Sequence, residues 1–489
     1  MKRLLAFLCV IGLILSGVIG VSSATTTVGS GLGDANLNGQ VGADDALLVL
    51  QNVVGKVELT SIQSSAADMD CSDDIGSADA LQILRQVVGK TVQFTGLTDQ
   101  TFTIGSVYAS KYTADTAFGR AWQQAVAKAE QKYGVSISVV PLNLAEESDS
   151  LFFYDMIEVS VNEIRSLARK GKLMDLNNNV VFPEDVRKSG STASCQMGDK
   201  LYGVASNAMS ANPMGIAINK DLVSRYAPNA FAKLQEQFEQ KKWTWEALTA
   251  LAEEYQAGSK QKGVMMSNTN IIGQAIVSNA GYEVTFLPDG SGAISSIATD
   301  EGIAALTYTK ELFTSGAYVY ESNVNAMFEK FREGKIPMVV YYLNDTASAA
   351  ADRGFELSAM PFPIGPAQND YVMCTFNSPA YAVPAGMSEY GNAYAMVLSA
   401  LAEADAAIAD GWVADAAQKG YDALGQSVYR WATANTSFDF STGPFTGAVG
   451  GPVDGSVLNK DMHPSVDVVN VKQLIQQEVD AYYGQFYKK

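Results

Sequence analysis

Histidine is almost absent from this sequence, since His463 is the only one among 489 residues. A catalytic or metal site built on several imidazoles is therefore excluded, and a lone His in the short stretch HPS gives little support for a site of its own. Cysteine is also scarce. Only Cys71, Cys195 and Cys374 lie beyond the N-terminal apolar run. Three widely spaced cysteines provide neither a disulfide framework nor the spacing of a metal site.

Positive charge is in deficit, because 34 Lys and Arg residues stand against 52 Asp and Glu residues, for a formal net charge of −18 at pH 7. A chain this acidic is disfavoured as a binder of nucleic acid or of anionic membranes. Apolar residues make up 47% of the chain, which is enough to form a large core. The length fits two or three domains.

Long apolar runs are missing after the first residues, where MKRLLAFLCVIGLILSGVIGVSSA combines two basic residues, an apolar run and a small-residue end. This pattern predicts a secretory signal peptide over residues 1–24, with cleavage after Ala24. A membrane anchor is the less favoured alternative, because the run is short and glycines interrupt it. Cys9 lies too early in the run to carry a lipid. We therefore expect a secreted protein, extracellular or associated with the cell surface.

A segment near the N-terminus occurs twice, first as GDANLNGQVGADDALLVLQNVVGK over residues 33–56 and again as DMDCSDDIGSADALQILRQVVGK over residues 68–90. In both copies an Asp-rich loop precedes an apolar stretch, and the two copies keep the same phase. A duplicated surface turn is the plain alternative, but it does not explain why loop spacing and apolar spacing are both preserved.

Oxygen-bearing residues occupy alternate positions of each loop, which is the spacing of an EF-hand calcium loop. The first loop offers Asp34, Asn36, Asn38, the backbone carbonyl of Gln40, and Asp45. The second loop offers Asp68, Asp70, Ser72, the backbone carbonyl of Asp74, and Asp79. The sharp turn at the sixth position has Gly39 in the first loop but Asp73 in the second, and Asp tolerates positive φ less well than Gly. We therefore predict two Ca²⁺ sites, the second weaker or distorted.

A helix is predicted after each loop, because apolar residues recur at helical spacing and a Gly-Lys pair ends each stretch. The repeated apolar residues are Leu47, Leu50, Val53 and Val54 in the first copy and Leu81, Leu84, Val87 and Val88 in the second. With Asp closing each loop, residues 33–91 resemble a type I dockerin, a small all-α calcium-binding domain. This resemblance implies docking onto a cohesin module of a scaffold protein. It also implies contact residues at the tenth and eleventh loop positions, which are Ala43, Asp44, Ser77 and Ala78. The two pairs differ, so symmetric docking is not expected.

The remainder of the chain, residues 98–489, is predicted to be α/β. Residues 100–110 and 137–143 have strand character on either side of a helix predicted over Ala117–Tyr133, which makes a βαβ unit. A further strand and helix follow, and Gly171 ends that helix. No glycine-rich phosphate loop follows a strand.

Five segments in order resemble bacterial extracellular solute-binding proteins of the sugar-binding, ABC-transporter type. They span residues 154–177, 198–222, 243–255, 327–345 and 355–366. The resemblance implies a two-lobed α/β fold like that of the type II periplasmic binding proteins. Lobe one would comprise residues of about 98–210 and 370–430, and lobe two residues of about 214–365. C-terminal helices would follow over residues 431–489.

Sugar ligands need flat aromatic faces fringed by amide and hydroxyl groups, and such residues occur at expected strand ends and loops. The candidates for the ligand cleft are Tyr108, Asn162, Asn207, Asn270, Tyr341, Tyr342, Asn344 and Asn377. Strand alternation lets only one of Tyr341 and Tyr342 face a cleft. Each candidate has a plain alternative as a packed aromatic or a turn-forming Asn.

These features together predict a monomeric, secreted oligosaccharide-binding protein that is not an enzyme. It would dock through calcium-bound repeats onto a cohesin scaffold of a polysaccharide-degrading complex and could pass sugars to an ABC permease. The alternative is a dockerin-borne glycoside hydrolase or another polysaccharide-active enzyme. A hydrolase needs a paired acid and nucleophile, and local sequence context marks no such pair.

Overall fold

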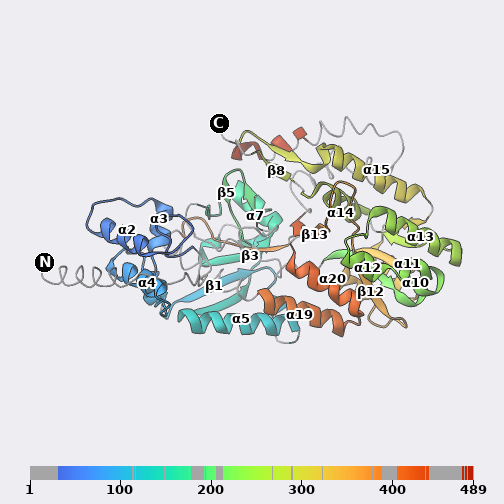
Figure 1. Ribbon diagram of the computed structural model, residues 1–489, viewed down its shortest axis with the longest axis horizontal. Helices are drawn as coiled ribbons and strands as arrows, with labels where there is room; N and C mark the ends of the chain where they lie inside the picture. The colour runs from blue at the N-terminus through green and yellow to red at the C-terminus, as the bar shows by residue number, and fades with distance from the viewer. Residues whose placement is uncertain are drawn as a thin grey trace.

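The structure is a computed structural model (Figure 1), and it describes most of the chain. The described residues are 31–97, 99–112, 115, 117–147, 150–177, 192, 194–204, 213–266, 268–282, 284–287, 290–315, 317–321, 323–375, 378–387, 405–435, 437–439, 476–477, 479–481 and 483–487. The predicted signal peptide, Asn207, Asn377 and His463 lie outside these residues. Within the described part, no helix has the length and apolar character needed to cross a membrane.

The N-terminal module is formed by α2 (Ala43–Val53), α3 (Ser61–Ala67) and α4 (Ser77–Val87), at one end of the molecule in Figure 1. The helices α2 and α4 pack against each other through small and branched apolar residues, which include Ala46, Val49 and Ile83. The helices end where the sequence predicted, because Gly55 and Gly89 take positive φ values of 72° and 68°.

The first lobe is built on a four-stranded sheet in the order β14-β3-β1-β2. Its strands are β1 (Thr101–Ser106), β2 (Ser136–Pro141), β3 (Met156–Ser160) and β14 (Pro379–Ala382). The first three run parallel, and β14 joins β3 in the antiparallel sense. The described helices of this lobe are α5 (Ala117–Tyr133), α6 (Leu144–Glu147), α7 (Val161–Arg169) and α19 (Asp405–Gln418), with short 3₁₀ turns η2 (Ala109–Tyr112) and η3 (Leu151–Phe153). A small hairpin pairs β4 (Gln196–Met197) with β5 (Lys200–Leu201).

The second lobe is built on a five-stranded mixed sheet in the order β10-β7-β11-β6-β12. Its strands are β6 (Met214–Asn219), β7 (Val264–Met266), β10 (Tyr318–Tyr320), β11 (Met338–Tyr342) and β12 (Leu357–Pro361). Its described helices are α10 (Lys220–Tyr226), α11 (Pro228–Phe231), α12 (Leu234–Glu239), α13 (Trp245–Ser259), α14 (Asn268–Ala280), α15 (Asp300–Thr314), α16 (Val324–Arg332) and α17 (Leu343–Ala349). Helices and sheet alternate along the chain, as the sequence predicted for this region.

The C-terminal part of the chain crosses between the lobes. Helix α19 packs on α5 of the first lobe, whereas α20 (Ala423–Ala434) packs on β12 of the second lobe. The resemblance places residues 370–430 in lobe one. The start of α20 differs from that expectation, because the buried face of this helix packs on the second sheet. The other predicted boundaries stay predictions. Two small sheets complete the described strands, β8 (Val284–Phe286) with β9 (Ala293–Ser295) and β13 (Met373–Thr375) with β15 (Ser437–Asp439).

Residues 476–487, where described, touch both lobes. The Gln476 amide donates to the carbonyl oxygen of Ala293 at 2.7 Å, next to the β8–β9 pair. The ring of Phe486 lies 6.0 Å from that of Tyr202 in the first lobe. The final η8 (Gly484–Phe486) therefore packs back onto the first lobe.

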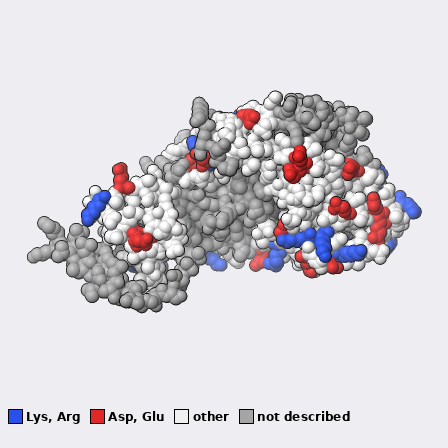
Figure 2. Space-filling model, turned by 45° about the horizontal axis from the view of Figure 1, so that its top comes forward, with Lys and Arg blue, Asp and Glu red and all other residues white. Residues whose placement is uncertain are grey.

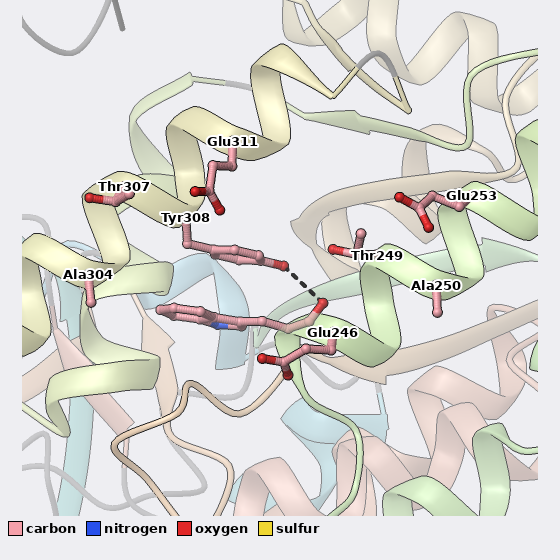
Figure 3. Close-up of a pocket in the computed structure, with 9 residues that line it drawn as sticks. Glu246, Thr249, Ala250, Glu253, Ala304, Thr307, Tyr308 and Glu311 are labelled. Carbon is pink, nitrogen blue, oxygen red and sulfur yellow. Dashed lines mark hydrogen bonds between the residues drawn. The ribbon is translucent and has the colours of Figure 1, made fainter. Parts of the chain in front are cut away.

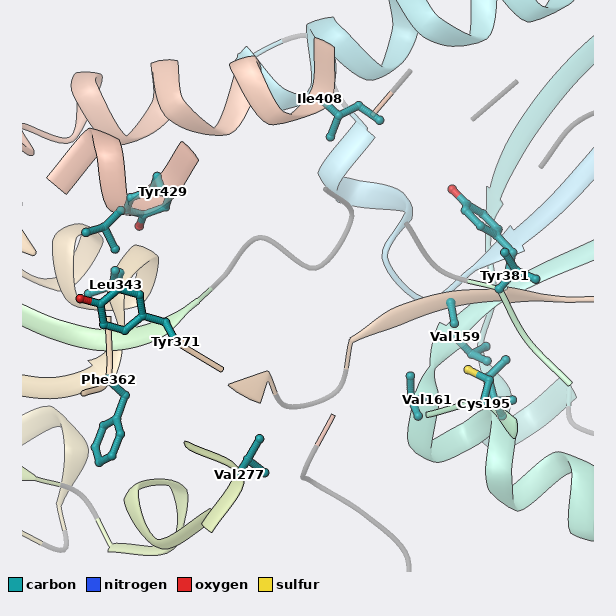
Figure 4. Packing of buried hydrophobic residues seen from close by; sticks show 14 of the residues in the cluster. Val159, Val161, Cys195, Val277, Leu343, Phe362, Tyr371, Tyr381, Ile408 and Tyr429 are labelled. Atoms are coloured by element: carbon teal, nitrogen blue, oxygen red, sulfur yellow. The ribbon is translucent and has the colours of Figure 1, made fainter. Parts of the chain in front are cut away.

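Buried apolar residues of both lobes belong to one continuous cluster. In Figure 4, Val159, Val161 and Cys195 gather around β3 and α7, while Phe362 and Tyr371 lie in another part of it. All five side chains are less than one-tenth exposed. On the face drawn in Figure 2, the described surface of the second lobe carries both acidic and basic side chains, with the basic ones mostly toward its lower and outer edges.

Candidate functional site

The first Asp-rich loop is closed by carboxylates that accept backbone amides. Asp34 accepts from the amides of Asn38 at 3.0 Å and Gly39 at 2.7 Å, and Asp45 accepts from those of Asn36 at 2.9 Å and Gly42 at 2.8 Å. The two carboxylates are buried, with 7% exposure for Asp34 and none for Asp45. These bonds hold both ends of the loop toward one centre, as an EF-hand loop requires.

Two further predicted ligands of the first loop shape its turn. The side-chain oxygen of Asn36 accepts from the amide of Asn38 at 3.0 Å, and that of Asn38 accepts from the amide of Gln40 at 2.9 Å. Gly39 takes the positive φ expected at the sixth position, 85°. The alternate oxygens therefore lie along the inner side of one tight turn.

The second loop repeats this pattern at the matching positions. Asp68 accepts from the amide of Ser72 at 3.0 Å, and Asp79 accepts from the amides of Asp70 at 3.2 Å and Gly76 at 2.8 Å. Asp73 adopts a φ of 61°, the left-handed conformation that the sequence predicted to be costly for a residue other than Gly. The hydroxyl of Ser72 donates to the carbonyl oxygen of Asp74 at 3.4 Å.

Three carboxylates of the second loop converge closely. Asp68, Asp70 and Asp79 each offer an oxygen within 4.8 Å of the others, and all three residues are buried. Burial, and after it the charge of Asp79, raises the pKa of Asp68 to about 7. Burial also raises the pKa of Asp79 and of Asp45 in the first loop. An all-oxygen, acidic donor set of this kind fits a hard divalent cation such as Ca²⁺, whose charge offsets the mutual repulsion.

The outer faces of α2 and α4 carry matching exposed apolar side chains. Leu47, Val53 and Val54 on the first copy are 53%, 45% and 53% exposed. Leu81, Val87 and Val88 on the second copy are 44%, 44% and 58% exposed. The four predicted contact residues Ala43, Asp44, Ser77 and Ala78 are exposed as well. The apolar spacing that predicted the helices therefore marks, in large part, a solvent-facing stripe.

In the first lobe, two predicted ligand residues follow the carboxyl ends of parallel strands. Tyr108 follows β1, and its amide donates to the hydroxyl oxygen of Ser106 at 2.9 Å. The ammonium of Lys111 lies 4.0 Å from the centre of the Tyr108 ring. Asn162 lies in the first turn of α7, directly after β3, and both predicted residues are half-buried. The carboxyl ends of such strands are where open α/β sheets bind ligands.

In the second lobe, three predicted residues surround the end of β11. Tyr341 and Tyr342 are its last residues, and both are half-buried. The Tyr341 ring packs edge-on against Phe328 at 5.2 Å, so Tyr341 is partly engaged with α16. Asn344 lies in the first turn of α17, and its side-chain oxygen accepts from the ammonium of Lys419.

Electrostatic interactions link the surroundings of the predicted ligand residues in the first lobe to those in the second lobe. Burial lowers the pKa of Lys111 in the first lobe, while Glu158 on β3 and Asp345 on α17 raise it. Asp345 also raises the pKa of Tyr341, after burial. The interaction of Lys111 with Asp345 indicates that η2 of the first lobe lies near the start of α17 in the second lobe.

Sequence reasoning missed a buried polar cluster formed by residues of β1, β3 and η2. Glu158 is fully buried, and its carboxylate accepts from the hydroxyls of Ser106 and Tyr112. A charged residue inside the otherwise apolar strand MIEVS was the signal that could have identified it. Lys111, Asp345 and Lys419 gave no such signal.

The remaining predicted ligand residues are not tested. Asn270 lies in the first turn of α14, and its side chain is outside the described part, as are Asn207 and Asn377 entirely. A separate groove of about 480 Å³ runs between α13 and α15 (Figure 3). The rings of Trp245 and Tyr308 stack there with centroids 4.1 Å apart. Both walls belong to one lobe, so closure of the lobes would not enclose it.

Comparisons with known proteins agree with this architecture. The family model described as "Bacterial extracellular solute-binding protein" matches residues 113–414. A comparison with curated proteins finds no match. Among solved structures, the chain is similar to a cyclic α-maltosyl-1,6-maltose binding protein from Arthrobacter globiformis, with 16% identity, a TM-score of 0.54 and coverage of 79% of this chain and 100% of that one.

Two further solved structures show the same likeness of fold. A cyclo/maltodextrin-binding protein complexed with maltotetraose has 16% identity, a TM-score of 0.52 and coverage of 78% of this chain and 98% of that chain. The bacterial solute receptor AcbH has 13% identity, a TM-score of 0.51 and coverage of 79% and 100%. These matches confirm the two-lobed α/β fold predicted for the larger part of the chain.

Proposed function

This chain belongs to the bacterial extracellular solute-binding protein family, and from that premise we propose that it binds an oligosaccharide between its two lobes. What supports the proposal is that Tyr108 and Asn162 follow strand ends of the first-lobe sheet, while Tyr342 and Asn344 lie at the end of β11 in the second lobe. Aromatic faces and amide groups are the surfaces that sugar rings and hydroxyls bind. The solved relatives named for maltose-type sugars and β-D-galactopyranose support the same ligand class.

The test is a thermal-shift screen of the full chain in fixed excess calcium against plant-cell-wall and storage oligosaccharides. A ligand that binds only the folded state raises the melting temperature by mass action, with about 2.7 kcal/mol of stabilisation at 100 times Kd. We expect a saturable shift with one class of sugar and no product on long incubation. No shift with any sugar would refute a sugar ligand.

Matched variants locate the binding site. Tyr108→Ala and Asn344→Ala should each weaken binding of the sugar found by the screen by about tenfold, the loss of roughly 1.4 kcal/mol for one polar or stacking contact. Thr307→Ala, in the groove between α13 and α15, is the control and should leave the affinity unchanged. Equal affinity in all three variants would place the ligand elsewhere.

For the N-terminal module, we propose a type I dockerin that binds two Ca²⁺ ions and docks onto a cohesin module of a scaffold protein. The converging carboxylates of both loops support calcium, which the loop oxygens described above would hold. The exposed apolar stripes on α2 and α4, flanked by Ala43–Asp44 and Ser77–Ala78, support docking, since patches of this kind mark interaction sites. The second site is the weaker of the two because of the strained Asp73.

Docking is tested by titrating purified cohesin modules into the full chain, in calcium and in chelator. We expect binding in calcium only. Leu47→Asp should abolish it, because a charge would be buried in the interface. The exposed substitution Gln235→Glu on α12 is the control. Binding that survives chelation would contradict a calcium-set docking surface.

In this proposal the protein is secreted and captures sugars released by neighbouring enzymes of a polysaccharide-degrading complex. Hand-off to an ABC permease extends the same proposal. The second candidate, a glycoside hydrolase, would be supported by slow cleavage of a sugar in the screen.

A further inference from the structure

We propose that residues 91–97, which lead from the N-terminal module to the first lobe, bind to the second calcium loop, so that calcium in that loop fixes how the two parts are oriented. This inference rests on the calcium binding proposed above. It adds that the second loop has an intramolecular partner, for which the described part of the chain shows no counterpart at the first loop.

The joining segment contacts a predicted calcium ligand directly. The amide of Gly96 donates to the backbone carbonyl oxygen of Asp70 at 2.9 Å. The hydroxyl of Thr95 donates to a carboxylate oxygen of the same Asp70 at 3.3 Å. Asp70 is only 6% exposed. The position of the segment therefore depends on where the loop holds Asp70.

Gly96 fits this contact because it has no side chain. A Cβ atom there would lie 2.0 Å from the carbonyl oxygen of Cys71 and 2.4 Å from its carbonyl carbon. Cys71 itself has a φ of 58° and is 8% exposed. Two backbones thus meet face to face, and neither can shift without breaking the contact.

A second pair of bonds holds the segment to α4. The amide of Gln93 donates to the side-chain oxygen of Gln82 at 3.0 Å, and Gln82 is 5% exposed. The guanidinium of Arg85 donates to the carbonyl oxygen of Thr91 at 2.8 Å. The segment therefore follows the N-terminal module for several residues beyond the end of its last helix.

The other end of the segment is bound to the first lobe. The ring of Phe94 packs edge-on against Tyr133, the last residue of α5, at 5.0 Å. The amide of Asp99 donates to Gly134 at 3.0 Å, and the carbonyl of Gln100 accepts from the amide of Ser136 at 2.8 Å. The described residues of the segment therefore contact the module on one side and the first lobe on the other, which makes a held connection and not a free linker.

Comparison of the two repeats shows what the segment changes. At the fourth loop position, Leu37 of the first copy is 47% exposed, whereas Cys71 of the second is 8% exposed. At the third position, the side-chain amide of Asn36 donates to the carboxylate of Asp44 in its own copy at 2.8 Å, whereas the carboxylate of Asp70 accepts from the hydroxyl of Thr95. Without the joining segment, we expect matching positions of the two repeats to be about equally exposed to solvent.

The dependence of this contact on calcium follows from the geometry of the second loop. Three carboxylates within 4.8 Å repel one another unless a cation lies between them. Loss of the cation should let the loop relax, which moves the two oxygens of Asp70 that hold Thr95 and Gly96. By reciprocity, the docked segment should raise the calcium affinity of the second loop.

Hydrogen exchange of the full chain tests the first consequence. In excess calcium the amides of Gln93 and Gly96 should be protected, and in chelator they should exchange about tenfold faster or more, as local opening predicts. Asp68→Ala in calcium should reproduce the chelator result. Asp34→Ala, the matched change in the first loop, should leave both amides protected.

A variant that keeps every calcium ligand tests the reciprocal consequence. Thr95→Val replaces the hydroxyl that donates to Asp70, so the calcium affinity of one of the two sites should fall about fivefold by calorimetry, a coupling at the lower end of the usual range. Thr91→Val, which leaves the Thr91 carbonyl in place, is the control. Thr95→Val is expected to fold as the natural chain does.

Each outcome is decisive. Two calcium ions bound, with equal exchange of residues 91–97 in calcium and in chelator, would overturn the coupling while leaving the calcium module intact. Unchanged affinity in Thr95→Val would do the same. If calorimetry finds no bound calcium, the proposed calcium module itself fails and the coupling fails with it.

Discussion

Replacement of Glu158 gives the sharpest test of the buried polar cluster in the first lobe. We expect Glu158→Leu to destabilise the chain strongly and Glu158→Gln to destabilise it little at neutral pH. Glu158 is fully buried on β3, and its carboxylate accepts from Ser106 and Tyr112. Leucine fills a similar volume but accepts no hydrogen bond, whereas glutamine keeps a carbonyl oxygen and adds a donor.

The expected magnitude follows from the hydroxyls left behind. Ser106 and Tyr112 are 1% and 7% exposed, so water cannot replace the lost acceptor. A buried hydroxyl that loses the acceptor for its proton costs about 1–3 kcal/mol. Two such hydroxyls give a loss of roughly 2–6 kcal/mol in the free energy of unfolding for Glu158→Leu. For Glu158→Gln we expect about 1 kcal/mol or less at neutral pH, since both hydroxyls can keep a partner.

The pH dependence gives a second, independent readout. Burial raises the pKa of Glu158 above its ordinary value of 4.5, although the bonds from Ser106 and Tyr112 and the charge of Lys111 lower it in part. A raised pKa favours the neutral carboxyl in the folded chain. Its stabilising contribution is therefore complete below about pH 4.5 and is lost as the pH rises through the folded-state pKa. Glu158→Gln should gain stability relative to the natural chain over that rise.

Urea unfolding in fixed excess calcium measures these differences, with the natural chain and both variants followed from about pH 4.5 to 8. Glu246→Gln on the exposed surface of α13 is the control for loss of a carboxylate. Equal costs for the leucine and glutamine variants would refute the hydrogen-bond argument. A glutamine-minus-natural difference that stays constant with pH would refute the burial argument.

Three further predictions concern the module and the second lobe. Chelation of calcium should lower the stability of the N-terminal module by about 2.7 kcal/mol for each site that is held at 100 times its Kd, and a melting curve unaffected by chelator would contradict this. Ile83→Ala, in the buried face of α4, should cost about 2–4 kcal/mol, whereas Leu81→Ala on its exposed face should cost less than about 0.5 kcal/mol in the same urea assay. Asp422→Ala should lower the free energy of unfolding by about 1–3 kcal/mol. Asp422 accepts from the Ser358 hydroxyl at 2.8 Å and from the Gly425 amide at 3.0 Å, at the start of α20. A cost near zero would show that water replaces both bonds.

Local patterns predicted individual elements well. The helix predicted over Ala117–Tyr133 has those bounds in the structure, and Gly171 takes the positive φ of a helix end. Helical spacing also located α2 and α4. It could not tell whether the stripe faces a core or the solvent, because Leu47 and Val49 are equally apolar and only the packing of α2 on α4 distinguishes them.

Contacts between distant parts of the sequence escaped prediction. Ser106, Tyr112 and Glu158 meet only because β1 and β3 pair side by side, and nothing local marks that pairing. The docking of α20 on the second sheet is likewise a property of its buried face and not of its position in the chain. The loop residues of the N-terminal module were easier, because their oxygens are spaced within a dozen residues and the duplication repeats the spacing.

The paired stripes on α2 and α4 also affect how this protein behaves in bulk solution. Six large apolar side chains face water when no partner covers them, and such surfaces promote self-association. The formal net charge of −18 opposes this, since like-charged chains repel one another over a Debye length. Repulsion weakens as salt rises, to a range of about 3 Å at 1 M. Colloidal stability of the undocked chain should therefore depend on ionic strength, with dilute, low-salt conditions keeping it dispersed until a partner covers the stripes.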